Sequence, residues 1–546
     1  MAIVLGLSMG HDGAAAIVRD GKLVCAIAKE RINRKKHSGG VTKELVQYVL
    51  DHAGLKLEQI DAVACGGYDA TPQDDPHWPV VYNGDGSRVT APIMFPPDPG
   101  GSLTHVIDFD GLRKPFHTFS HHMSHCAAAY YTSNQVQSAC FSVDASGPIH
   151  LTSLFSYGYG NKMFPLYIPG VQMGCVYGYF CEALGLGPQI NKAGTLMGLA
   201  PYGTVRPVAR ERIDFYKKSI HEIRHMWQGD YDWSYHRAIW GELSGYAPHF
   251  RFNRDISDNR ESMDIAASIQ FVLEEVLIHW STELYKHTKS YNGGNLCLGG
   301  GTFLNCDANS EIQDRAPFDR VFHFPACGDE GVEVGAAFLC AGHIFDDPRV
   351  FHSAADICYT GREYATPQIG VPLDLGAVAK VISEGGVVAW YQGRSEFGPR
   401  ALGNRSILGD PRRADIKDYL NTRIKRREWF RPFAPVVLRE KANEWFYFDR
   451  ESPFMLHKAP VRRPKEIPGV THVDGSARLQ TVRREDNPRY YDLIVEFEKI
   501  TGVPVLVNTS LNVNNEPLAE RPEDAIRFFE TTEAAALVIN DRMILR

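Results

Sequence analysis

Two segments of the chain repeat a strand–turn–strand pattern. In the first, the apolar residues 3–7 and 14–18 flank the polar turn Ser8–Gly13. In the second, residues 139–155 place the small-residue turn Asp144–Gly147 between two apolar runs. Short apolar runs around glycine-containing turns predict β-strands joined by tight turns. A chain with two such units favours a duplicated sheet architecture, in which the two polar turns face a shared cleft.

A run of glycines forms a third element of the same kind. Residues 295–305, NLCLGGGTFLN, are an apolar strand that ends in Gly299, Gly300 and Gly301 and leads into a predicted helix near Asn305. Glycines at the carboxyl end of a strand let a nucleotide approach the backbone, and the amino end of the next helix favours its negative charge. A glycine-rich turn alone is a weak signal, because many are only tight turns. With the two hairpins, it predicts a duplicated actin-like or sugar-kinase-like nucleotide fold.

The chain is too long for one hydrophobic core. A chain of 546 residues usually divides into two or more domains. Hydrophobic periodicity is lost over residues 342–366, which include Asp346-Asp347-Pro348. We therefore predict an α/β domain over residues 1–350 and a second α/β domain over residues 366–546.

Composition indicates an ordinary globular protein with no membrane partner. Apolar residues make up 44% of the chain and charged residues 23%. The amino terminus, MAIVLGLSMGHDG, lacks the charged region of a signal peptide, and no apolar stretch is long enough to cross a bilayer. None of the eleven cysteines forms a C-x-x-C pair, so they are interpreted as reduced core thiols. These features predict a cytoplasmic location.

Residues 391–435 contain nine arginines among glycines and prolines, although the whole chain has a net charge of −7. Guanidinium groups bind phosphate and carboxylate in a bidentate way, so the run predicts a buried oxyanion site. The alternatives are a solvated basic surface or a basic arm for nucleic acid. Such an arm would be rich in lysine and poor in Phe and Trp, whereas this run carries Phe397, Trp429, Phe430 and Phe433. A folded anion site is therefore favoured, and no nucleic-acid partner is expected.

Two histidines have the spacing of metal ligands. His121 and His125 are four residues apart in a predicted helix, so both imidazoles project from one face. His122 is three residues from His125 and competes for the same role. Asp144 and Asp329, each in a small-residue turn, are the candidate carboxylates. Two histidines and two carboxylates with open positions suit six-coordinate Fe²⁺, Mn²⁺ or Mg²⁺ better than a closed zinc site.

Ten ordered motifs closely resemble the O-carbamoyltransferases of the NodU/CmcH family, over nearly the whole chain. The longest, GRSEFGPRALGNRSIL at residues 393–408, is highly specific. The other nine are HDGAAA at 11–16, ERINRKKH at 30–37, HHMSH at 121–125, TLMGLAPYG at 195–203, GGGTFLNCDAN at 299–309, GDEGVEVGAA at 328–337, KRREWFRPFAP at 425–435, DGSARLQTV at 474–482 and VNTSLN at 507–512.

The resemblance implies a fold and a reaction. The amino-terminal domain would be similar to the tRNA threonylcarbamoyl-transfer enzymes, with a duplicated actin/hexokinase-like fold, and the carboxyl-terminal domain would be YrdC-like. Family members make carbamoyladenylate from carbamoyl phosphate and ATP and pass the carbamoyl group to an alcohol. The expected partners are therefore carbamoyl phosphate and a hydroxylated small-molecule acceptor, and assembly as a homodimer is left open.

The same resemblance implies roles for individual residues. A divalent metal, Fe²⁺ first and Mg²⁺ or Mn²⁺ as alternatives, would be bound by His121, His125, Asp144 and Asp329. ATP would lie against Gly299, Gly300, Gly301 and Asn305. Carbamoyl phosphate and its intermediates would contact Arg400, Arg405, Lys425, Arg431, Arg478, Asn508 and Ser510. Lys425 and Arg431 would be catalytic, as would His11, which would take the proton of the acceptor hydroxyl.

The chain departs from the family pattern in its second hairpin turn. The family commonly has Asp-Gly-x-Gly-Glu, whereas residues 144–148 are DASGP. The loss of a glycine and an acid predicts that the phosphate contacts of this turn differ.

Two alternative functions and the role of one segment are not decided by the sequence. A threonylcarbamoyl-type tRNA modification enzyme would need a basic path for tRNA, which a chain at −7 does not indicate. A non-transferring actin-like ATPase would leave the arginine-rich site without a purpose. Segment 203–262 is rich in aromatic residues that would line an acceptor pocket or form part of the core: Trp227, Tyr231, Trp233, Tyr235 and Trp240.

Overall fold

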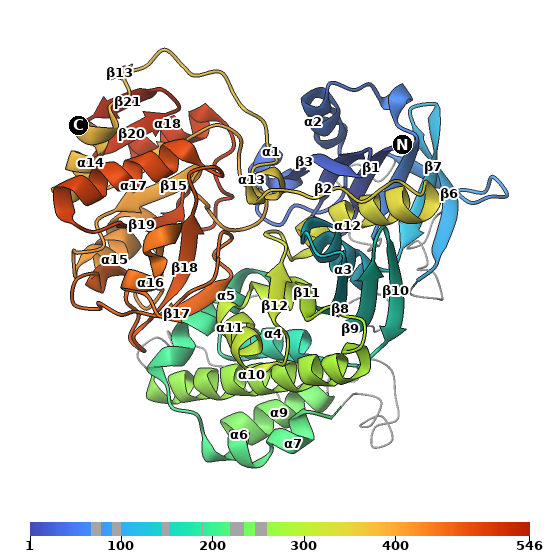
Figure 1. The fold of residues 1–546 in the computed structure, drawn as a ribbon, viewed down its shortest axis with the longest axis horizontal. Helices are drawn as coiled ribbons and strands as arrows, with labels where there is room; N and C mark the ends of the chain where they lie inside the picture. Colours follow the sequence, from blue (N-terminus) through green and yellow to red (C-terminus); the bar gives the residue numbers. More distant parts are fainter. Residues whose placement is uncertain (67–77, 90–99, 145–151, 188, 219–233, 246–258) are drawn as a thin grey trace. The chain divides into compact units, whose positions relative to one another are not determined.

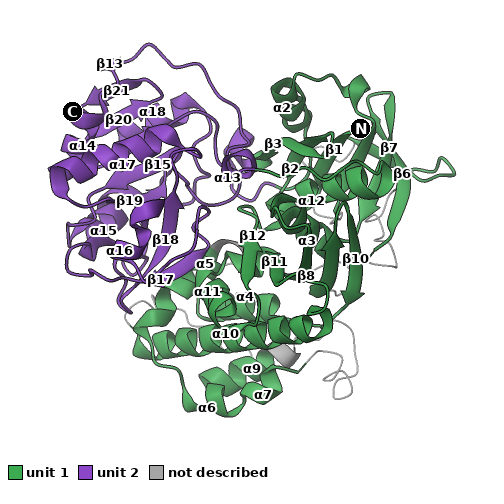
Figure 2. Cartoon of the chain, in the orientation of Figure 1, with its two compact units in different colours: residues 1–29, 39–352 green, residues 30–38, 353–546 purple. Residues whose placement is uncertain are grey.

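The chain folds into two compact units (Figures 1 and 2). The structure, a computed structural model, describes residues 1–66, 78–89, 100–144, 152–187, 189–218, 234–245 and 259–546. Unit 1 comprises residues 1–29 and 39–352, and unit 2 comprises residues 30–38 and 353–546. The division falls at residue 352, within the predicted link, but the early segment 30–38 belongs to unit 2 and not to the amino-terminal unit.

Segment 30–38 is attached to unit 2 by two arginines. Arg31 Nη2 donates to the carbonyl oxygen of Gly398 at 2.5 Å. Arg34 Nη1 donates to the carbonyl oxygen of Leu518 at 2.6 Å, and Arg34 Nε lies 3.4 Å from Asp524 Oδ1. Arg31 and Gly398 are more than 360 positions apart in the sequence. Local sequence patterns therefore do not predict these contacts.

The first sheet of unit 1 has the strand order β3-β2-β1-β4-β7-β6-β5. β1 pairs antiparallel with β2 and parallel with β4, β2 pairs antiparallel with β3, and β4 pairs parallel with β7. The strands are β1 (Ile3–Ser8), β2 (Ala14–Arg19), β3 (Lys22–Ala28), β4 (Ala62–Cys65), β5 (Val80–Tyr82), β6 (Ser102–Phe109) and β7 (Leu112–Phe119). The first predicted hairpin is confirmed as β1 and β2.

The second sheet of unit 1 repeats this arrangement, with the order β10-β9-β8-β11-β12. Its first three strands pair antiparallel, and β8, β11 and β12 pair parallel. The strands are β8 (Gln137–Val143), β9 (Ser153–Tyr159), β10 (Lys162–Tyr167), β11 (Asn295–Gly299) and β12 (Arg320–His323). The five strands β3-β2-β1-β4-β7 of the first sheet thus correspond in order and direction to the five strands of the second. This is the duplication expected of an actin/hexokinase-like fold, which is confirmed for unit 1.

Helices α3 (His121–Thr132) and α12 (Val332–Leu339) pack against each other, and α12 also packs on β1. The long helix α10 (Arg260–Thr288), near the bottom of Figure 1, packs on α11, and its residues Ile265, Ile269 and Val272, which the sequence predicted as core, are buried. The other helices of unit 1 are α2 (Lys43–Ala53), α4 (Met173–Ala183), α5 (Gln189–Leu199), α6 (Pro207–Glu211), α7 (Ile213–Tyr216), α9 (Ser234–Ser244) and α11 (Cys306–Arg315). In the described part of the chain, no helix is both long and apolar enough to span a membrane.

Unit 2 is built on a nine-stranded sheet with the order β13-β21-β20-β14-β15-β19-β16-β18-β17. Its strands are β13 (Val371–Pro372), β14 (Val388–Tyr391), β15 (Arg405–Gly409), β16 (Ala434–Leu438), β17 (His457–Pro460), β18 (Ser476–Val482), β19 (Val505–Ser510), β20 (Ala536–Ile539) and β21 (Arg542–Leu545). The predicted strands near residues 387–390 and 503–507 are confirmed as β14 and β19. Parallel and antiparallel pairs mix in this sheet, so the α/β class is confirmed here too; the YrdC-like identity stays a prediction.

The helices of unit 2 cover a core formed by the sheet. The core includes the fully buried Trp390, Leu408, Val436 and Leu537. The helices are α14 (Leu375–Ser383), α15 (Ile416–Tyr419), α16 (Ala442–Trp445), α17 (Pro488–Thr501) and α18 (Pro522–Thr531), with the short α1 (Lys29–Asn33) and α13 (Ala354–Cys358) near the points where the chain passes between units. After α15 the chain forms a π-helical turn, Leu420–Lys425, and such turns occur frequently at functional sites.

Candidate functional site

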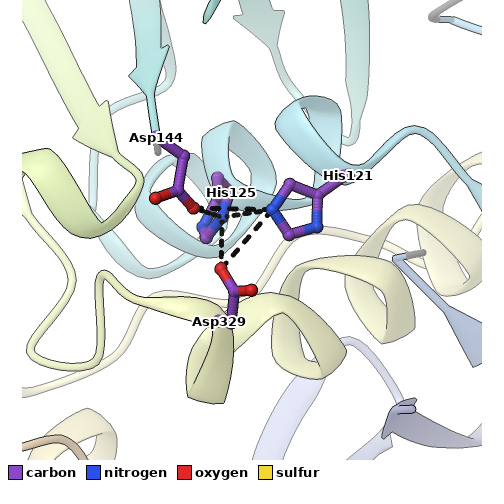
Figure 3. Close-up of side chains that lie close together, drawn as sticks. All are labelled: His121, His125, Asp144 and Asp329. Atoms are coloured by element: carbon purple, nitrogen blue, oxygen red, sulfur yellow. Dashed lines mark hydrogen bonds and ion pairs between the residues drawn. The ribbon is translucent and has the colours of Figure 1, made fainter. Parts of the chain in front are cut away.

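Four side chains from three parts of unit 1 meet at one point (Figure 3). His125 Nε2 lies 3.0 Å from Asp144 Oδ2, 3.1 Å from His121 Nε2 and 3.4 Å from Asp329 Oδ1. His121 Nε2 lies 3.4 Å from Asp329 Oδ1. The four potential ligand atoms all lie within 4.8 Å of one another. The structure therefore brings together the four residues that the sequence predicted as metal ligands.

The choice between His121 and His122 is settled by the rotation of α3. His122 is buried, and its Nδ1 forms a 2.5 Å hydrogen bond with Ser142 Oγ on β8. His121 points instead toward His125 and Asp329 (Figure 3). The pair with the four-residue spacing is therefore the one in the cluster.

Glycines allow the elements that carry this cluster to approach closely. A Cβ on Gly335 of α12 would lie 1.8 Å from the carbonyl oxygen of Ser124, and one on Gly299 would lie 2.4 Å from the carbonyl oxygen of His125. Gly300 has a φ of +102°, and a Cβ there would lie 2.2 Å from the carbonyl oxygen of Val143. These positions require glycine for packing around α3 and β8.

The glycine run also borders the cluster. A Cβ on Gly301 would lie 3.1 Å from Asp144 Oδ1. Asn305 caps α11 by accepting a 3.1 Å hydrogen bond from the N–H of Ala308, and its Nδ2 donates to Gln270 Oε1 at 3.0 Å. The structure thus gives Gly299, Gly300 and Asn305 structural roles, and their contact with a nucleotide stays a prediction.

His11, in the turn after β1, lies at the edge of the cluster. Its Nδ1 is 3.3 Å from Asp329 Oδ2, and its Nε2 is 3.6 Å from Asp12 Oδ2. Its side chain is 35% exposed, compared with 1% for His125. A small molecule can therefore reach His11 while the inner histidine is closed to solvent.

The histidines and aspartates of the cluster shift one another's pKa values. Burial lowers the pKa of His121, but the charge of Asp329 and hydrogen bonds to Asp144 and Asp329 raise it to about 10. Burial raises the pKa of Asp329, but His121 and His125 hold it well below its usual range. The cluster is therefore built to hold positive charge between its carboxylates, whether as protons on the imidazoles or as a bound cation.

Unit 2 contains a buried lysine at the end of the π-helical turn. Lys425 Nζ donates to Ser510 Oγ at 3.0 Å and to Asn512 Oδ1 at 2.6 Å, and also to the carbonyl oxygen of Ser510. Burial lowers the pKa of Lys425 well below its usual value, and the charges of Arg427, Arg431 and Lys36 lower it further. The early segment 30–38 thus contributes a cation to this site, which the sequence did not predict.

Arg431 adds positive charge to the same cluster with little compensation. Its nearest carboxylate among the described residues is Glu428, with Nη1 and Oε2 3.8 Å apart. Burial lowers the pKa of Arg431, and Arg478 lowers it further, against the opposing effect of Glu428. Lys425 is buried, and Arg427, Arg431 and Arg478 are partly buried. We call these four residues the basic cluster, and such an excess of positive charge favours an anion.

Arg405 has a different environment from the one predicted. It is fully buried, and its guanidinium donates to the carbonyl oxygens of Gln392 at 2.6 Å, Asn404 at 3.0 Å and Gly393 at 3.1 Å. The group also lies 3.6 Å from the centre of the Tyr391 ring. Main-chain carbonyls thus occupy the Nη1 and Nη2 N–H groups that would otherwise bind a phosphate. This geometry gives Arg405 a structural role and does not support the predicted anion contact.

The loop that carries Arg400 is organised by a buried carboxylate, Glu396. Its Oε1 accepts hydrogen bonds from three backbone N–H groups, those of Leu402 at 2.7 Å, Asn404 at 2.8 Å and Arg405 at 3.0 Å. Sequence reasoning missed Glu396, although an acid among arginines was a signal. Next to this loop, Asn508 Nδ2 donates to the carbonyl oxygen of Ala401 at 3.0 Å, so β19 fixes the loop from its other side.

Several residues of interest lie outside the described part of the chain. They are residues 145–148 of the second hairpin turn and the candidate pocket residues Trp227, Tyr231 and Trp233. Trp240 is described and fully buried, with its ring centre 5.1 Å from that of Phe180. Trp240 therefore belongs to the core and not to an open acceptor pocket.

Comparisons with known proteins place the chain among carbamoyltransferases. The family model for the carbamoyltransferase N-terminus matches residues 3–76 and 106–338, and that for the carbamoyltransferase C-terminus matches residues 379–546. The chain is 34% identical to nodulation protein NolNO of Sinorhizobium fredii, over 98% of this chain and 79% of that protein. It is 31% identical to 3'-hydroxymethylcephem-O-carbamoyltransferase of Streptomyces clavuligerus, over 99% and 98% of the two chains.

Likeness to solved structures is slight. A ROK hexokinase from Thermus thermophilus is 13% identical with a TM-score of 0.28, over 63% of this chain and 99% of that one. HypF from T. kodakarensis is 12% identical with a TM-score of 0.32, over 65% and 48%. These scores add nothing to the strand order described above.

Proposed function

Because the chain belongs to the carbamoyltransferase family, we propose that it converts carbamoyl phosphate and ATP to carbamoyladenylate and transfers the carbamoyl group to a hydroxyl of a small natural-product molecule. Relatives named as O-carbamoyltransferases match nearly its whole length, and the chain is itself an O-carbamoyltransferase. The proposal on donor and mechanism rests mainly on one observation. The same chain has the partly buried basic cluster in unit 2 and a group of two histidines and two aspartates in unit 1.

The basic cluster is suited to carbamoyl phosphate and its products. Lys425, Arg431, Arg478 and Arg400 would hold the phosphate while water cleaves phosphate from the carbamoyl group to leave carbamate. A carbamate oxygen then attacks the α-phosphorus of ATP, and pyrophosphate leaves. Ser510, which accepts a hydrogen bond from Lys425 Nζ, and Asn508, next to the Arg400 loop, would orient the small carbamoyl group.

The group of four in unit 1 fits a divalent metal. Two imidazole nitrogens and two carboxylate oxygens, close enough to share one ion, are ligands that Fe²⁺, Mn²⁺ and Mg²⁺ accept, with Fe²⁺ the first candidate. A bound ion would supply positive charge that stabilises the phosphate oxygens of a nucleotide. Gly301 has no side chain beside Asp144, so its backbone would allow the close approach of a phosphate group.

His11 is placed to act on the acceptor. In the transfer step the acceptor oxygen attacks the carbamoyl carbon of carbamoyladenylate, AMP leaves, and the hydroxyl proton moves to His11 Nε2. The Nδ1 atom of His11 lies 3.3 Å from Asp329 Oδ2, so this carboxylate would orient the ring and stabilise the proton that the ring gains. The partial exposure of His11 lets an acceptor approach it.

Product analysis tests the proposed function. Purified protein would be supplied with ATP, Mg²⁺ and Fe²⁺, with and without carbamoyl phosphate, across a panel of hydroxylated acceptors, and products would be identified by mass spectrometry. We expect AMP only when carbamoyl phosphate is present, and one acceptor that gains an HNCO unit. Conversion of ATP to ADP regardless of carbamoyl phosphate would overturn the proposal and favour an actin-like ATPase.

A further inference from the structure

We propose that Arg427 is a further anion-binding residue of the basic cluster and that Asn421 positions it to hold a phosphate oxygen. This inference rests on the proposed function, since it assigns Arg427 to the site proposed for carbamoyl phosphate. Arg427 is one of the nine arginines of residues 391–435, but neither it nor Asn421 was among the residues assigned to carbamoyl phosphate from the sequence.

Asn421, within the π-helical turn, forms hydrogen bonds with the loop that follows this turn. It is fully buried, and its Oδ1 accepts a 2.8 Å hydrogen bond from Arg427 Nε. Its backbone carbonyl accepts the N–H of Arg427 at 3.0 Å, and its Nδ2 donates to the carbonyl oxygen of Arg431 at 2.9 Å. One buried amide therefore fixes the side chain of Arg427 and the backbone of Arg431 together.

This attachment leaves the outer end of the Arg427 guanidinium available. Its Nε is used by Asn421, and its planar group lies 4.7 Å from the centre of the Phe433 ring. Among the described residues, Nη1 and Nη2 have no hydrogen-bond partner. A guanidinium held by its Nε, with two parallel N–H groups left over, has the geometry that binds a phosphate in a bidentate way.

The other arginines of residues 391–435 show that this is unusual. Arg412 is paired with Asp410 at 2.6 Å and Arg413 with Asp415 at 2.7 Å. The guanidinium groups of Arg394 and Arg405 donate to main-chain carbonyls. Among the described residues, the Arg427 guanidinium has no carboxylate and no main-chain carbonyl as a partner, only the side-chain amide of Asn421, which distinguishes it from these four.

The surroundings of Arg427 favour a negative ligand. Burial lowers the pKa of Arg427 well below its usual value, and the charges of Arg431 and Arg478 lower it further, against a smaller opposing effect of Glu428. Like charges held together in a partly buried position repel one another until an anion binds. A phosphate would relieve this repulsion and bring Lys425, Arg427 and Arg431 around one charge.

Arg426 supplies a matched control. It is the next residue in the chain, is exposed, and has a left-handed backbone with a φ of +51°. Arg426→Asn removes one positive charge from the same loop and keeps a residue that tolerates this backbone. Arg427→Gln removes the guanidinium, and Arg427→Lys keeps the charge but loses the pair of terminal N–H groups.

The test compares these variants in carbamoyl-phosphate-dependent AMP formation, with inorganic phosphate as an inhibitor and as a ligand in calorimetry. For Arg427→Gln we expect the KM for carbamoyl phosphate and the Kd for phosphate to rise about tenfold or more, with the KM for ATP within about twofold of wild type. For Arg427→Lys we expect a KM for carbamoyl phosphate and a Kd for phosphate between those of wild type and Arg427→Gln. Arg426→Asn is expected to match wild type in both. Melting temperatures check that each variant is folded.

The outcomes separate this inference from the proposed function. Wild-type values for carbamoyl phosphate and phosphate in Arg427→Gln would overturn the inference, as would an equal loss in Arg426→Asn. If Arg427→Gln does not fold, Arg427→Lys decides, and an unchanged KM and Kd there would overturn it. If wild-type protein binds phosphate but forms no carbamoyl-phosphate-dependent AMP, the proposed function fails, and the phosphate Kd of the variants still tests Arg427.

Discussion

His125 Nε2 lies 3.0 Å from Asp144 Oδ2, a contact that joins helix α3 to the residue that follows strand β8. Asp329, which begins a turn before α12, reaches the same nitrogen from the other side at 3.4 Å. The three elements meet closely because Gly335 and Gly299 leave no side chain between them. The cluster is therefore a product of the folded unit 1, and its affinity for a metal should depend on each of its members.

Replacement of His125 by alanine should remove the metal. The variant loses one of the two proposed imidazole ligands, so we expect metal affinity to fall by at least about 100-fold. His122→Gln is the control, because His122 bonds to Ser142 and lies outside the cluster. Metal content after dialysis, measured by mass spectrometry for Fe²⁺, Mn²⁺ and Mg²⁺, checks this. Equal metal content in wild type and His125→Ala would contradict the assignment.

His11→Ala should separate the two half-reactions. His11 is 3.3 Å from Asp329 and is proposed to act only on the acceptor. We expect carbamoyl transfer to fall by about 10²–10⁴-fold, while formation of carbamoyladenylate continues. Single-turnover assays of adenylate and transfer product would measure both. Loss of both activities, or of neither, would remove His11 from the transfer step.

Lys425 should make carbamoyl phosphate binding depend on pH. Burial lowers the pKa of Lys425 well below its usual value of 10.5, so its ammonium form, which attracts the anion, is lost as pH rises through that lowered pKa. Affinity should therefore fall with rising pH, at a lower pH than an ordinary lysine would cause. Lys425→Gln should bind weakly at every pH and lack this dependence. Parallel pH curves for the two proteins would show that another group titrates.

Arg405→Lys should lower stability. Arg405 is fully buried and donates to the carbonyl oxygens of Gln392, Asn404 and Gly393, which a lysine cannot satisfy together. We expect a loss of about 3 kcal/mol or more in the free energy of unfolding. Arg412→Lys, at a partly exposed pair with Asp410, should cost about 1 kcal/mol or less. Urea unfolding compares the two, and equal losses would argue against a structural role for Arg405.

The sequence predicted the elements of the fold better than the partners of individual side chains. Apolar runs and glycine turns identify β1, β2 and β11 because local periodicity determines them. The roles of His121 and His122 could not be separated, because both lie within one helical turn of His125 and the packing of α3 on β8 selects between them.

Long-range contacts explain what the sequence could not show. Arg405 reads as a phosphate ligand in a glycine-rich motif, but its guanidinium meets main-chain carbonyls that no residue pattern marks. Segment 30–38 belongs to unit 2 through contacts such as that of Arg31 with Gly398. Asn421 has no motif of its own, and only the folded loop shows that it holds Arg427 and Arg431 together.

The most direct test of the account is the exchange of radiolabelled pyrophosphate into ATP without an acceptor. Formation of carbamoyladenylate is reversible, so we predict exchange that requires carbamoyl phosphate and is lost in Lys425→Gln but retained in His11→Ala. Exchange that does not need carbamoyl phosphate, or its absence while ATP is hydrolysed to ADP, would contradict the proposal that unit 2 activates a carbamoyl group with ATP.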